Sequence, residues 1–382
     1  MSRSDYGLFR PVLRAIEQRS DLEFLLYVSG MHLSPEFGCT EQEITEDGFP
    51  VSSRVEMLLS SDSPEGMSIS MGLGCMGFAQ IYAQDVPDIL LVLGDRFEMH
   101  AAALAAVPFN IPIAHIHGGE LTFGAIDDVL RHSITKISHV HFTSTREYAE
   151  RVIQMGEEPW RVTVSGAPGL DNLSTFRRLS EQEMRDSFGM DIAARPVLVT
   201  YHPVTREADY AEAQLNNMLA ALSSINMPLI FTSPNADAQG RRIIQIIRNF
   251  VAANDNARLI ENLGTDAFFT LLECASAMVG NSSSGLIEAP SFALPVVNIG
   301  TRQEGRVRAA NVIDVSGDAK AIGEAIQAAV RPEFRRQLTG MINPYGDGSA
   351  ATTIIDKLES IPIDQKLLVK RFHHVSGPGA EL

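Results

Sequence analysis

Short apolar runs recur along the chain, separated by polar and helix-forming segments. The most regular stretch extends from Pro87 to Ser144. Apolar runs of four to six residues are typical of strands buried on both faces of a parallel sheet. An Ala-rich helix (Ala101–Val107) and a helix opened by Asp127 separate them, which predicts a β-α-β-α-β unit. The three predicted strands of this unit are Ile89–Leu93, Ile111–Ile116 and His139–Thr143.

The same alternation returns after a polar segment, Asp171–Arg195. Two successive α/β runs of similar length imply two Rossmann-like domains with a cleft between them. We expect an N-terminal domain over residues 1–172, a C-terminal domain over residues 173–350, and a C-terminal helix and tail over residues 351–382 that cross back to the first. The strands predicted in the second domain are Val197–Thr200, Leu229–Phe231, Ala257–Ile260, Ala277–Val279 and Val296–Ile299.

The beginning of the chain is less regular. Arg3–Gly7 is expected to be a loop, followed by a helix over Leu8–Gln18 and a strand over Leu22–Val28. A helix with no strand before it is unusual for an α/β domain. Pro64–Gln84 is predicted to be a long helix.

Composition narrows the class of protein. The chain has 382 residues, 45% of them hydrophobic and 20% charged, as in ordinary globular proteins. Its net charge of -16 argues against a nucleic-acid-binding surface. Its three cysteines have no paired motif, so we expect reduced thiols and a cytoplasmic location. No apolar run approaches the roughly 18 residues of a membrane span, and the first residues lack the apolar core of a signal peptide.

Ionisable residues gather where the strands of the first domain end, the edge at which α/β sheets bind ligands. Carboxylates in a dry cleft can move protons near neutral pH, which makes Asp95, Glu120 and Asp127 acid/base candidates. The alternative is that these carboxylates form ion pairs with nearby cations. The other ionisable residues at this edge are Arg96, His115, His117, Arg131 and His132.

His115 and His117 also form an alternating pair, so we expect both side chains to point to one face of the strand. Such a pair, with Glu120 and Asp95, is a possible metal motif. Too few further histidines follow on later strands for a metal centre, so we expect no metal.

The segment Asn281–Gly285 is the strongest anion site in the second domain. A strand ends there in small hydroxyl residues and a helix, predicted over Leu286–Phe292, follows at once, so free backbone N–H groups could face a phosphate. A plain helix cap is the alternative. Nearby, the Glu288 carboxylate could accept hydrogen bonds from ribose hydroxyls, and Arg302 and His202 could contact a phosphate. Alternatively, Glu288 and Arg302 are ordinary surface residues and His202 is an ordinary residue at a strand end.

Together these segments resemble the hydrolysing UDP-N-acetylglucosamine 2-epimerases. The resemblance extends from Arg3 to about Glu359, and it depends on the order and spacing of the motifs. The motifs are GMHLSPEFG (30–38), GDRFE (94–98), HIHGGE (115–120), IDDVLRHSITKISHVHF (126–142), SGAPGLDNL (165–173), HPVT (202–205), GNSSSGLIE (280–288) and NIGTRQEGR (298–306).

The resemblance implies a GT-B fold, in which two Rossmann-like domains with parallel sheets bind UDP in the interdomain cleft, mainly through the second domain. Ser282 and Ser283 would hold the pyrophosphate and Glu288 the ribose. Asp95 and Asp127 would be the catalytic acid and base. No metal and no nicotinamide cofactor is implied. The remaining residues of the UDP-sugar site would be Arg3, Arg96, Gly166, His202 and Arg302.

The chain departs from the family pattern at two points. Members have a buried first strand before the Arg-x-Asp-Tyr motif, which starts here at Arg3. We therefore expect the natural protein to begin upstream, since apolar residues such as Leu25 and Leu91 would otherwise be uncovered. His117 stands where the human-type enzyme of this family has a glutamate leading into Gly-Gly, so the roles of His117, Glu120 and Asp127 in proton transfer stay open.

The implied reaction converts UDP-N-acetylglucosamine and water to N-acetylmannosamine and UDP through a 2-acetamidoglucal, for sialic acid synthesis. UDP-N,N'-diacetylbacillosamine, on the way to legionaminic acid, is an alternative substrate. A non-hydrolysing epimerase, a GT-B glycosyltransferase and a nucleotide-sugar binding module are alternative functions. A homo-oligomer is expected, with no membrane or nucleic-acid partner.

Overall fold

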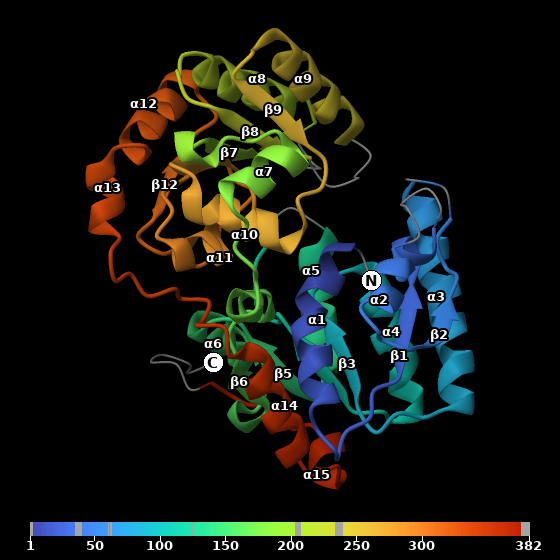
Figure 1. The fold of residues 1–382 in the computed structure, drawn as a ribbon. Coiled ribbons are helices and arrows are strands. Elements are labelled where there is room, and N and C mark those ends of the chain that lie inside the picture. Colours follow the sequence, from blue (N-terminus) through green and yellow to red (C-terminus); the bar gives the residue numbers. More distant parts are fainter. Residues whose placement is uncertain are drawn as a thin grey trace. The chain divides into compact units, whose positions relative to one another are not determined.

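The computed structural model describes residues 3–34, 40–59, 61, 63–123, 126–202, 208–233 and 240–375. The chain divides into two compact units, drawn as a ribbon in Figure 1. No helix in the described ranges is long and apolar enough to cross a membrane. Unit 1 comprises Met1–Leu121, Ile126–Asp171 and Tyr345–Leu382, and unit 2 comprises Thr122–Ala125 and Asn172–Pro344.

Unit 1 contains two parallel sheets. Strands β1 (Leu26–Ser29) and β2 (Val51–Val55) pair with each other, and four strands form a second sheet in the order β3-β4-β5-β6. Every residue of β4 and β5 is buried, as predicted for apolar strands covered on both faces. The strands of the second sheet are β3 (Leu90–Leu93), β4 (Ile113–Ile116), β5 (Val140–Thr143) and β6 (Val162–Val164).

Helices connect these strands in the alternation that the sequence predicts. The predicted helix over Pro64–Gln84 is confirmed as α3, and the hydroxyl of Ser63 caps it by accepting from the Gly66 N–H at 3.0 Å. The α-helices described in unit 1 are α1 (Arg3–Glu17), α2 (Glu41–Glu46), α3 (Pro64–Gln84), α4 (Phe97–Ala106), α5 (Ile126–Ile137), α6 (Arg146–Gln154), α14 (Ala350–Ser360) and α15 (Gln365–Leu368).

The predicted loop over Arg3–Gly7 is wrong, because α1 already begins at Arg3. Tertiary packing outweighs the weak helix propensity of this segment. Tyr6 and Phe9 are buried one turn apart on the same face, and the Tyr6 hydroxyl donates to the Asp47 carboxylate at 2.6 Å. The predicted strand over Leu22–Val28 is also shorter in the structure, where β1 begins only at Leu26.

Unit 2 is built on one parallel sheet with the strand order β12-β11-β10-β7-β8-β9. The chain runs outward from β7 through β8 to β9 and then returns to place β10 on the other side of β7. This reversal makes the carboxyl ends of β7 and β10 a topological switch point, where open α/β sheets bind ligands. The strands are β7 (Val197–Thr200), β8 (Leu229–Thr232), β9 (Ala257–Ile260), β10 (Ala277–Gly280), β11 (Val296–Ile299) and β12 (Val312–Val315).

The helix after β10 is shorter than predicted. It ends at Ile287, and a 3-10 turn over Ala289–Phe292 follows. Pro290 lacks the N–H that an α-helix would need there, and Ala293 closes the turn with a φ of 46°. The helices of unit 2 are α7 (Glu181–Phe188), α8 (Ala208–Ser223), α9 (Gly240–Ala253), α10 (Gly264–Cys274), α11 (Ser284–Ile287), α12 (Ala319–Ala329) and α13 (Pro332–Gln337).

The segment from Tyr345 onward is part of unit 1, where α14 packs against α1 (Figure 1). The Asp171 carboxylate caps α14 by accepting from the Ala350 and Ala351 N–H groups at 3.0 and 2.6 Å. The buried Arg161 guanidinium donates to the Leu367 carbonyl oxygen at 2.8 Å. These charge-assisted hydrogen bonds hold residues far apart in sequence in one core.

Glu157 is the centre of a buried charge cluster in the same unit. Its carboxylate accepts from Lys136 Nζ at 2.6 Å and His141 Nε2 at 3.1 Å, and it pairs with Lys370 Nζ at 2.7 Å. Burial alone would raise the pKa of this carboxyl, but the hydrogen bonds from His141, Lys136 and Lys370 bring the pKa down to about 2. Burial also lowers the pKa of His141.

We expect Glu157 to make the stability of unit 1 sensitive to acid. Its folded-state pKa is depressed below the ordinary 4.5, so its stabilisation is present above that pH and is lost as the pH falls toward 2. Glu157→Gln should lower the free energy of unfolding by up to about 3 kcal/mol at pH 7. The difference from the unsubstituted protein should shrink at pH 3, as measured by urea unfolding.

The control is Glu150→Gln, because the Glu150 side chain is 59% exposed and, among the described residues, forms an ion pair only with the exposed Arg146. This change should leave the free energy of unfolding within about 0.5 kcal/mol at both pH values. If Glu157→Gln lowered the free energy of unfolding equally at pH 7 and pH 3, the ionised Glu157 carboxylate would not be the source of the stabilisation.

Candidate functional site

In unit 1, Arg131 brings together the ends of β3 and β4. Asp95 follows β3 after Gly94, whose φ of 77° makes the turn. The Asp95 carboxylate forms an ion pair with the Arg131 guanidinium on α5. Arg131 is almost fully buried and also donates to the Glu120 carbonyl oxygen at 3.1 Å. The ion pairing that the sequence left as an alternative for Asp95 is therefore present.

His117 and Glu120 form a second pair just beyond β4. His117 adopts a φ of 65°, a left-handed conformation that a non-glycine residue rarely takes without a structural or functional reason. Its Nδ1 lies 2.6 Å from Glu120 Oε1, which also accepts from the Ser144 hydroxyl at 2.9 Å. The carboxylate selects the tautomer with a proton on Nδ1, so the lone pair is on Nε2. That buried Nε2 has no hydrogen-bond partner among the described residues.

His115 does not join this pair. Its Nε2 donates to the Gly94 carbonyl oxygen at 2.7 Å, and its Nδ1 lies 3.3 Å from the Thr135 hydroxyl. Burial lowers its pKa to about 3, so it is neutral and holds the turn before Asp95. The prediction that both histidines point to one face is wrong, because β4 ends at Ile116 and His117 has left-handed backbone. No group of three or more potential metal ligands occurs in the described part of the chain.

Other predicted residues of unit 1 lie around this edge or away from it. Asp127 is in the first turn of α5 and partly buried, and its neighbour Asp128 lies 3.6 Å from Arg131 Nη1. Arg96 precedes α4, with its Nε 3.6 Å from Glu98 Oε2. Gly166 faces Tyr345, whose carbonyl oxygen would be 3.0 Å from an added Cβ. The side chain of Arg3, at the first turn of α1, is outside the described residues.

In unit 2, Asn281 connects the ends of β7 and β10. Its side chain accepts from the His202 N–H at 2.7 Å and donates to the His202 carbonyl oxygen at 2.8 Å. Gly280 before it has a φ of 139°, and a Cβ there would lie 1.9 Å from the Thr200 carbonyl oxygen. Only glycine therefore permits this close approach of the two strand ends.

The loop after β11 reaches the same point. The Asn281 carbonyl oxygen accepts from Arg302 Nη1 at 3.0 Å and from Gln303 Nε2 at 2.8 Å. The Ser282 hydroxyl accepts from the Ser284 N–H at 3.3 Å, but Ser283, the N-cap residue of α11, makes no side-chain capping hydrogen bond. Because α11 has only four residues, its dipole is small, and Arg302 brings a full positive charge to this end of the sheet.

Ser283 and Glu288 flank α11, as N-cap and C-cap residues respectively, and both are partly buried. His202 is held by its backbone to Asn281, next to Arg302. Burial, together with the charge of Arg302, lowers the pKa of His202 to about 3. The imidazole is therefore neutral near pH 7 and could donate one N–H to an anion without carrying a charge. The structure thus brings His202, Ser282 and Arg302 to one switch point.

Three residues that organise these sites were given no specific role in the substrate site by the sequence: Arg131, Ser144 and Asn281. Arg131 was predicted only as a possible ion-pair partner, although a buried arginine on a helix facing strand ends requires an anion. Asn281 lies inside the GNSSSG motif, but nothing in a single sequence shows that an amide spans two strands. Ser144 ends β5 and could have been found from the same strand-end rule as Asp95.

The chain is similar to proteins of one enzyme family. The family model of UDP-N-acetylglucosamine 2-epimerases matches residues 14–359. The UDP-N,N'-diacetylbacillosamine 2-epimerase (hydrolyzing) of Legionella pneumophila is 36% identical, covering 97% of this chain and 96% of that protein. The UDP-N-acetylglucosamine 2-epimerase of Neisseria meningitidis serogroup B is 31% identical over 86% of this chain and 85% of that protein.

A solved structure of UDP-GlcNAc 2-epimerase from Neisseria meningitidis, bound to UDP-GlcNAc, superposes with a TM-score of 0.82. The two chains are 20% identical, and the match covers 94% of this chain and 98% of that one. This likeness confirms the predicted GT-B fold. The motif resemblance, the family model and the relatives above 30% identity agree, and the chain belongs to the UDP-N-acetylglucosamine 2-epimerase family, whose members are nucleotide-sugar 2-epimerases.

Proposed function

We propose that this protein is a hydrolysing 2-epimerase, which converts a UDP-2-acetamido sugar and water to UDP and the free C2-epimeric sugar. The observation that carries the proposal is the buried His117–Glu120 pair, which leaves the lone pair of His117 Nε2 available. An imidazole oriented by a carboxylate, with one bare ring nitrogen, is suited to accept a proton from a substrate.

The C2–H of the sugar has no adjacent carbonyl and is not acidic by itself. As the C1–O bond to UDP lengthens, C1 gains oxocarbenium character and the C2 proton becomes acidic. The base takes that proton, the C2–H electron pair forms the C1=C2 bond of a 2-acetamidoglucal, and UDP leaves with the C1–O electron pair. In the second step C2 takes a proton on the opposite face with the C1=C2 electron pair, the oxygen of water bonds to C1, and that water releases one proton to a base of the site.

Inversion at C2 requires two proton-transfer groups on opposite faces of the sugar. We assign one to His117, oriented by Glu120, and the other to a carboxylate at the same strand ends. Asp95 is favoured, since Arg131 holds its carboxylate in place, and Asp127 in the first turn of α5 is the other candidate. No metal or redox cofactor takes part in this scheme.

In unit 2, we assign the diphosphate of UDP to the switch point between β7 and β10. Ser282, Ser283, Arg302 and the neutral His202 offer hydrogen bonds and a positive charge where negative charge develops on the leaving group. Glu288 is assigned to the ribose, and Arg3, Arg96 and Gly166 complete the proposed substrate site. These roles follow from the family motifs and from the geometry of each unit taken separately.

The sugar itself has two candidates. N-acetylmannosamine is the product if the substrate is UDP-N-acetylglucosamine, the substrate in the name of the Neisseria relative. UDP-N,N'-diacetylbacillosamine is favoured by the higher identity to the Legionella protein named for it and to a Campylobacter jejuni protein named for its GDP/UDP forms. Sialic acid and legionaminic acid synthesis, respectively, are the proposed pathways.

We also propose that the protein works in the cytoplasm as a homo-oligomer. The free thiols of Cys75 and Cys274 support a reducing compartment. The non-hydrolysing epimerase and the GT-B glycosyltransferase remain the rival activities. Chromatography separates them, because only the hydrolysing reaction releases UDP with water as the sole co-substrate.

The first test of the mechanism replaces His117 by asparagine. Asparagine tolerates the left-handed backbone of this position better than most residues, so the fold should persist. We expect kcat to fall by about 10²-fold or more, since a general base is lost. UDP affinity and the melting temperature should change little. The control, His100→Asn, alters a histidine of α4 that contacts Ser133 and should keep nearly full activity.

The second test concerns UDP. Ser282→Ala or Arg302→Ala should weaken UDP binding by roughly ten- to a hundredfold, because a charge-assisted hydrogen bond contributes about 1.5–3 kcal/mol. Ser276→Ala is the matched control at the opposite end of β10, where the Ser276 hydroxyl donates to the Arg195 carbonyl oxygen. Calorimetry showing the same UDP affinity in all three variants would refute this assignment.

The third test follows the atoms. In heavy water the early product should carry deuterium at C2, and in ¹⁸O-water its C1 oxygen should come from solvent. Both UDP-N-acetylglucosamine and UDP-N,N'-diacetylbacillosamine should be assayed, and the substrate with the larger kcat/KM identifies the sugar. A product that retains the original C2 hydrogen would exclude the elimination scheme, whichever sugar is used.

A further inference from the structure

The loop His117–Glu120, which follows β4, has a backbone conformation that the surrounding structure must hold in place. His117 and Gly119 both lie in the left-handed region, with φ of 65° and 80°. For His117 this conformation is strained, and strained backbone persists only where neighbouring contacts fix it. Gly118 and Gly119 have no side chains, so neighbouring elements can approach the loop closely.

Neighbours pack directly against both glycines. On one side, a Cβ at Gly118 would lie 3.1 Å from His115 Nδ1 and 3.2 Å from the hydroxyl oxygen of Thr135 on α5. On the other side, a Cβ at Gly119 would overlap the carbonyl oxygen of Tyr148 on α6. The loop is therefore enclosed by the end of β4, by α5 and by the first turn of α6.

Arg151 of α6 holds the backbone of the loop. Its guanidinium donates to the Gly119 carbonyl oxygen and lies over the Tyr148 ring, 5.4 Å from the ring centroid. Its Nη2 also lies 3.1 Å from the Glu147 carboxylate, one helical turn earlier. Two contacts on its own helix thus fix the direction in which Arg151 donates to the loop.

Ser144, which follows β5, holds the carboxylate of the loop. Its buried hydroxyl donates to Glu120 Oε1 at 2.9 Å, and the same oxygen lies 2.6 Å from His117 Nδ1. Rotation of the carboxylate would break both hydrogen bonds. The orientation of Glu120 that selects a proton on Nδ1 and leaves Nε2 bare therefore depends on Ser144 as well as on His117.

We propose that Ser144 and Arg151 are positioning residues of the 2-epimerase reaction, an inference that rests on the role as base proposed for His117. Ser144 fixes the Glu120 carboxylate and Arg151 fixes the Gly119 backbone, so that His117 offers one bare nitrogen in one orientation. Neither residue contacts the substrate. Their contribution is preorganisation, because the base is oriented when the protein folds and not anew at each turnover.

The first readout is the tautomer of His117 in the whole chain without substrate. The ¹⁵N chemical shifts of histidine-labelled protein distinguish a protonated ring nitrogen from a bare one, and His117→Asn identifies the resonances of His117. The unsubstituted protein should show a protonated Nδ1 and a bare Nε2. Ser144→Ala and Arg151→Gln should each raise the fraction protonated at Nε2 by roughly tenfold, as expected for one lost hydrogen bond.

The second readout is the division of the effect between kcat and KM. Both variants should lower kcat by about tenfold and leave KM for the UDP-sugar within about twofold, because only the chemical step is affected. Ser144→Thr keeps the hydroxyl and Arg151→Lys keeps a donor, so both should recover most of kcat. In the double variant the loss of kcat should be smaller than the product of the single losses, since both residues act on one loop.

Two matched controls carry the same chemical changes away from the loop. Ser138→Ala removes a buried hydroxyl at the opposite end of β5, where it donates to the Ile134 carbonyl oxygen at 2.7 Å. Arg146→Gln removes an arginine of α6 whose side chain is 89% exposed and which pairs with Glu150. Neither change should alter the His117 tautomer or kcat.

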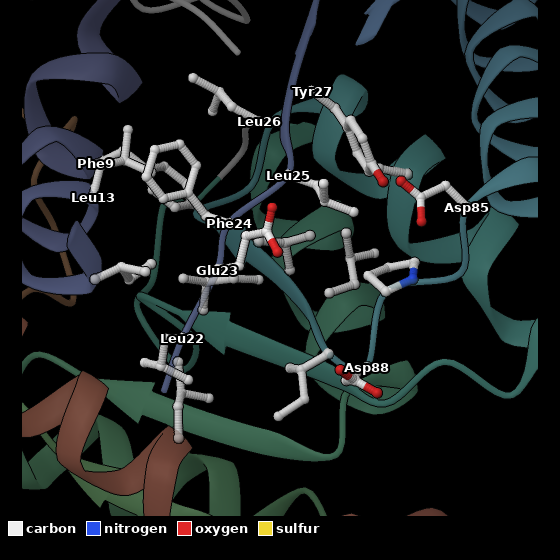
Figure 2. Close-up of a pocket in the computed structure, with 18 of the residues that line it drawn as sticks. Phe9, Leu13, Leu22, Glu23, Phe24, Leu25, Leu26, Tyr27, Asp85 and Asp88 are labelled. Carbon is white, nitrogen blue, oxygen red and sulfur yellow. The ribbon is translucent and has the colours of Figure 1, made fainter. Parts of the chain in front are cut away.

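A third control removes packing in unit 1 without touching the loop. A cavity of about 840 Å³ is lined by Leu13 of α1, the segment Leu22–Tyr27 and Leu90–Val92 of β3 (Figure 2). No residue of the loop lines this cavity. Leu13→Ala should lower the melting temperature by several degrees and leave the His117 tautomer unchanged, which separates positioning from general stability.

The results decide between the positioning role and the base role separately. An unchanged His117 tautomer in both Ser144→Ala and Arg151→Gln would overturn the proposal, as would an equal effect of Arg146→Gln. A double variant whose loss of kcat equals the product of the single losses would also overturn it. A changed tautomer with unchanged turnover would uphold Ser144 and Arg151 as the residues that position the loop and would refute the base role of His117 instead.

Discussion

The arrangement of polar residues at the strand ends of unit 1 depends on neutralising one buried cation. The Arg131 guanidinium is almost completely removed from water, and a charge in that position is tolerated only with an anion and hydrogen-bond acceptors around it. Asp95 supplies the anion and Glu120 supplies a carbonyl oxygen. The need to satisfy Arg131 therefore brings the ends of β3 and β4 and the start of α5 together. His117 is positioned on the same short loop as Glu120.

In unit 2 a neutral side chain, that of Asn281, connects the strand ends. Asn281 spans β7 and β10 through both of its amide atoms, and its own carbonyl oxygen receives Arg302 and Gln303. Each hydrogen bond contributes modestly, but together they fix three loops at one point. The guanidinium of Arg302 is thereby held in place by the protein itself. Preorganisation of this kind lowers the cost of binding an anion.

Much of the fold could be predicted from the sequence, because buried parallel strands leave unbroken apolar runs. The strands His139–Thr143 and Val296–Ile299 were placed within one residue of their observed bounds. Errors occurred where distant contacts overrule local propensity, as at the start of α1, or where backbone geometry departs from the strand pattern, as at His117. The candidate residues were recognised by type and by motif. Their partners depend on contacts across more than a hundred residues in the case of Asp171 and α14, which no local pattern contains.

The division of the chain has a consequence for its synthesis. Unit 2 is almost continuous in sequence from Asn172 to Pro344, whereas unit 1 is completed only by the segment that begins at Tyr345. The buried guanidinium of Arg161 and the carboxylate of Asp171 must wait for that segment to leave the ribosome. Domains generally fold as units and in order of emergence. Here the half that emerges first should be the last to reach its native state, with unit 2 already folded.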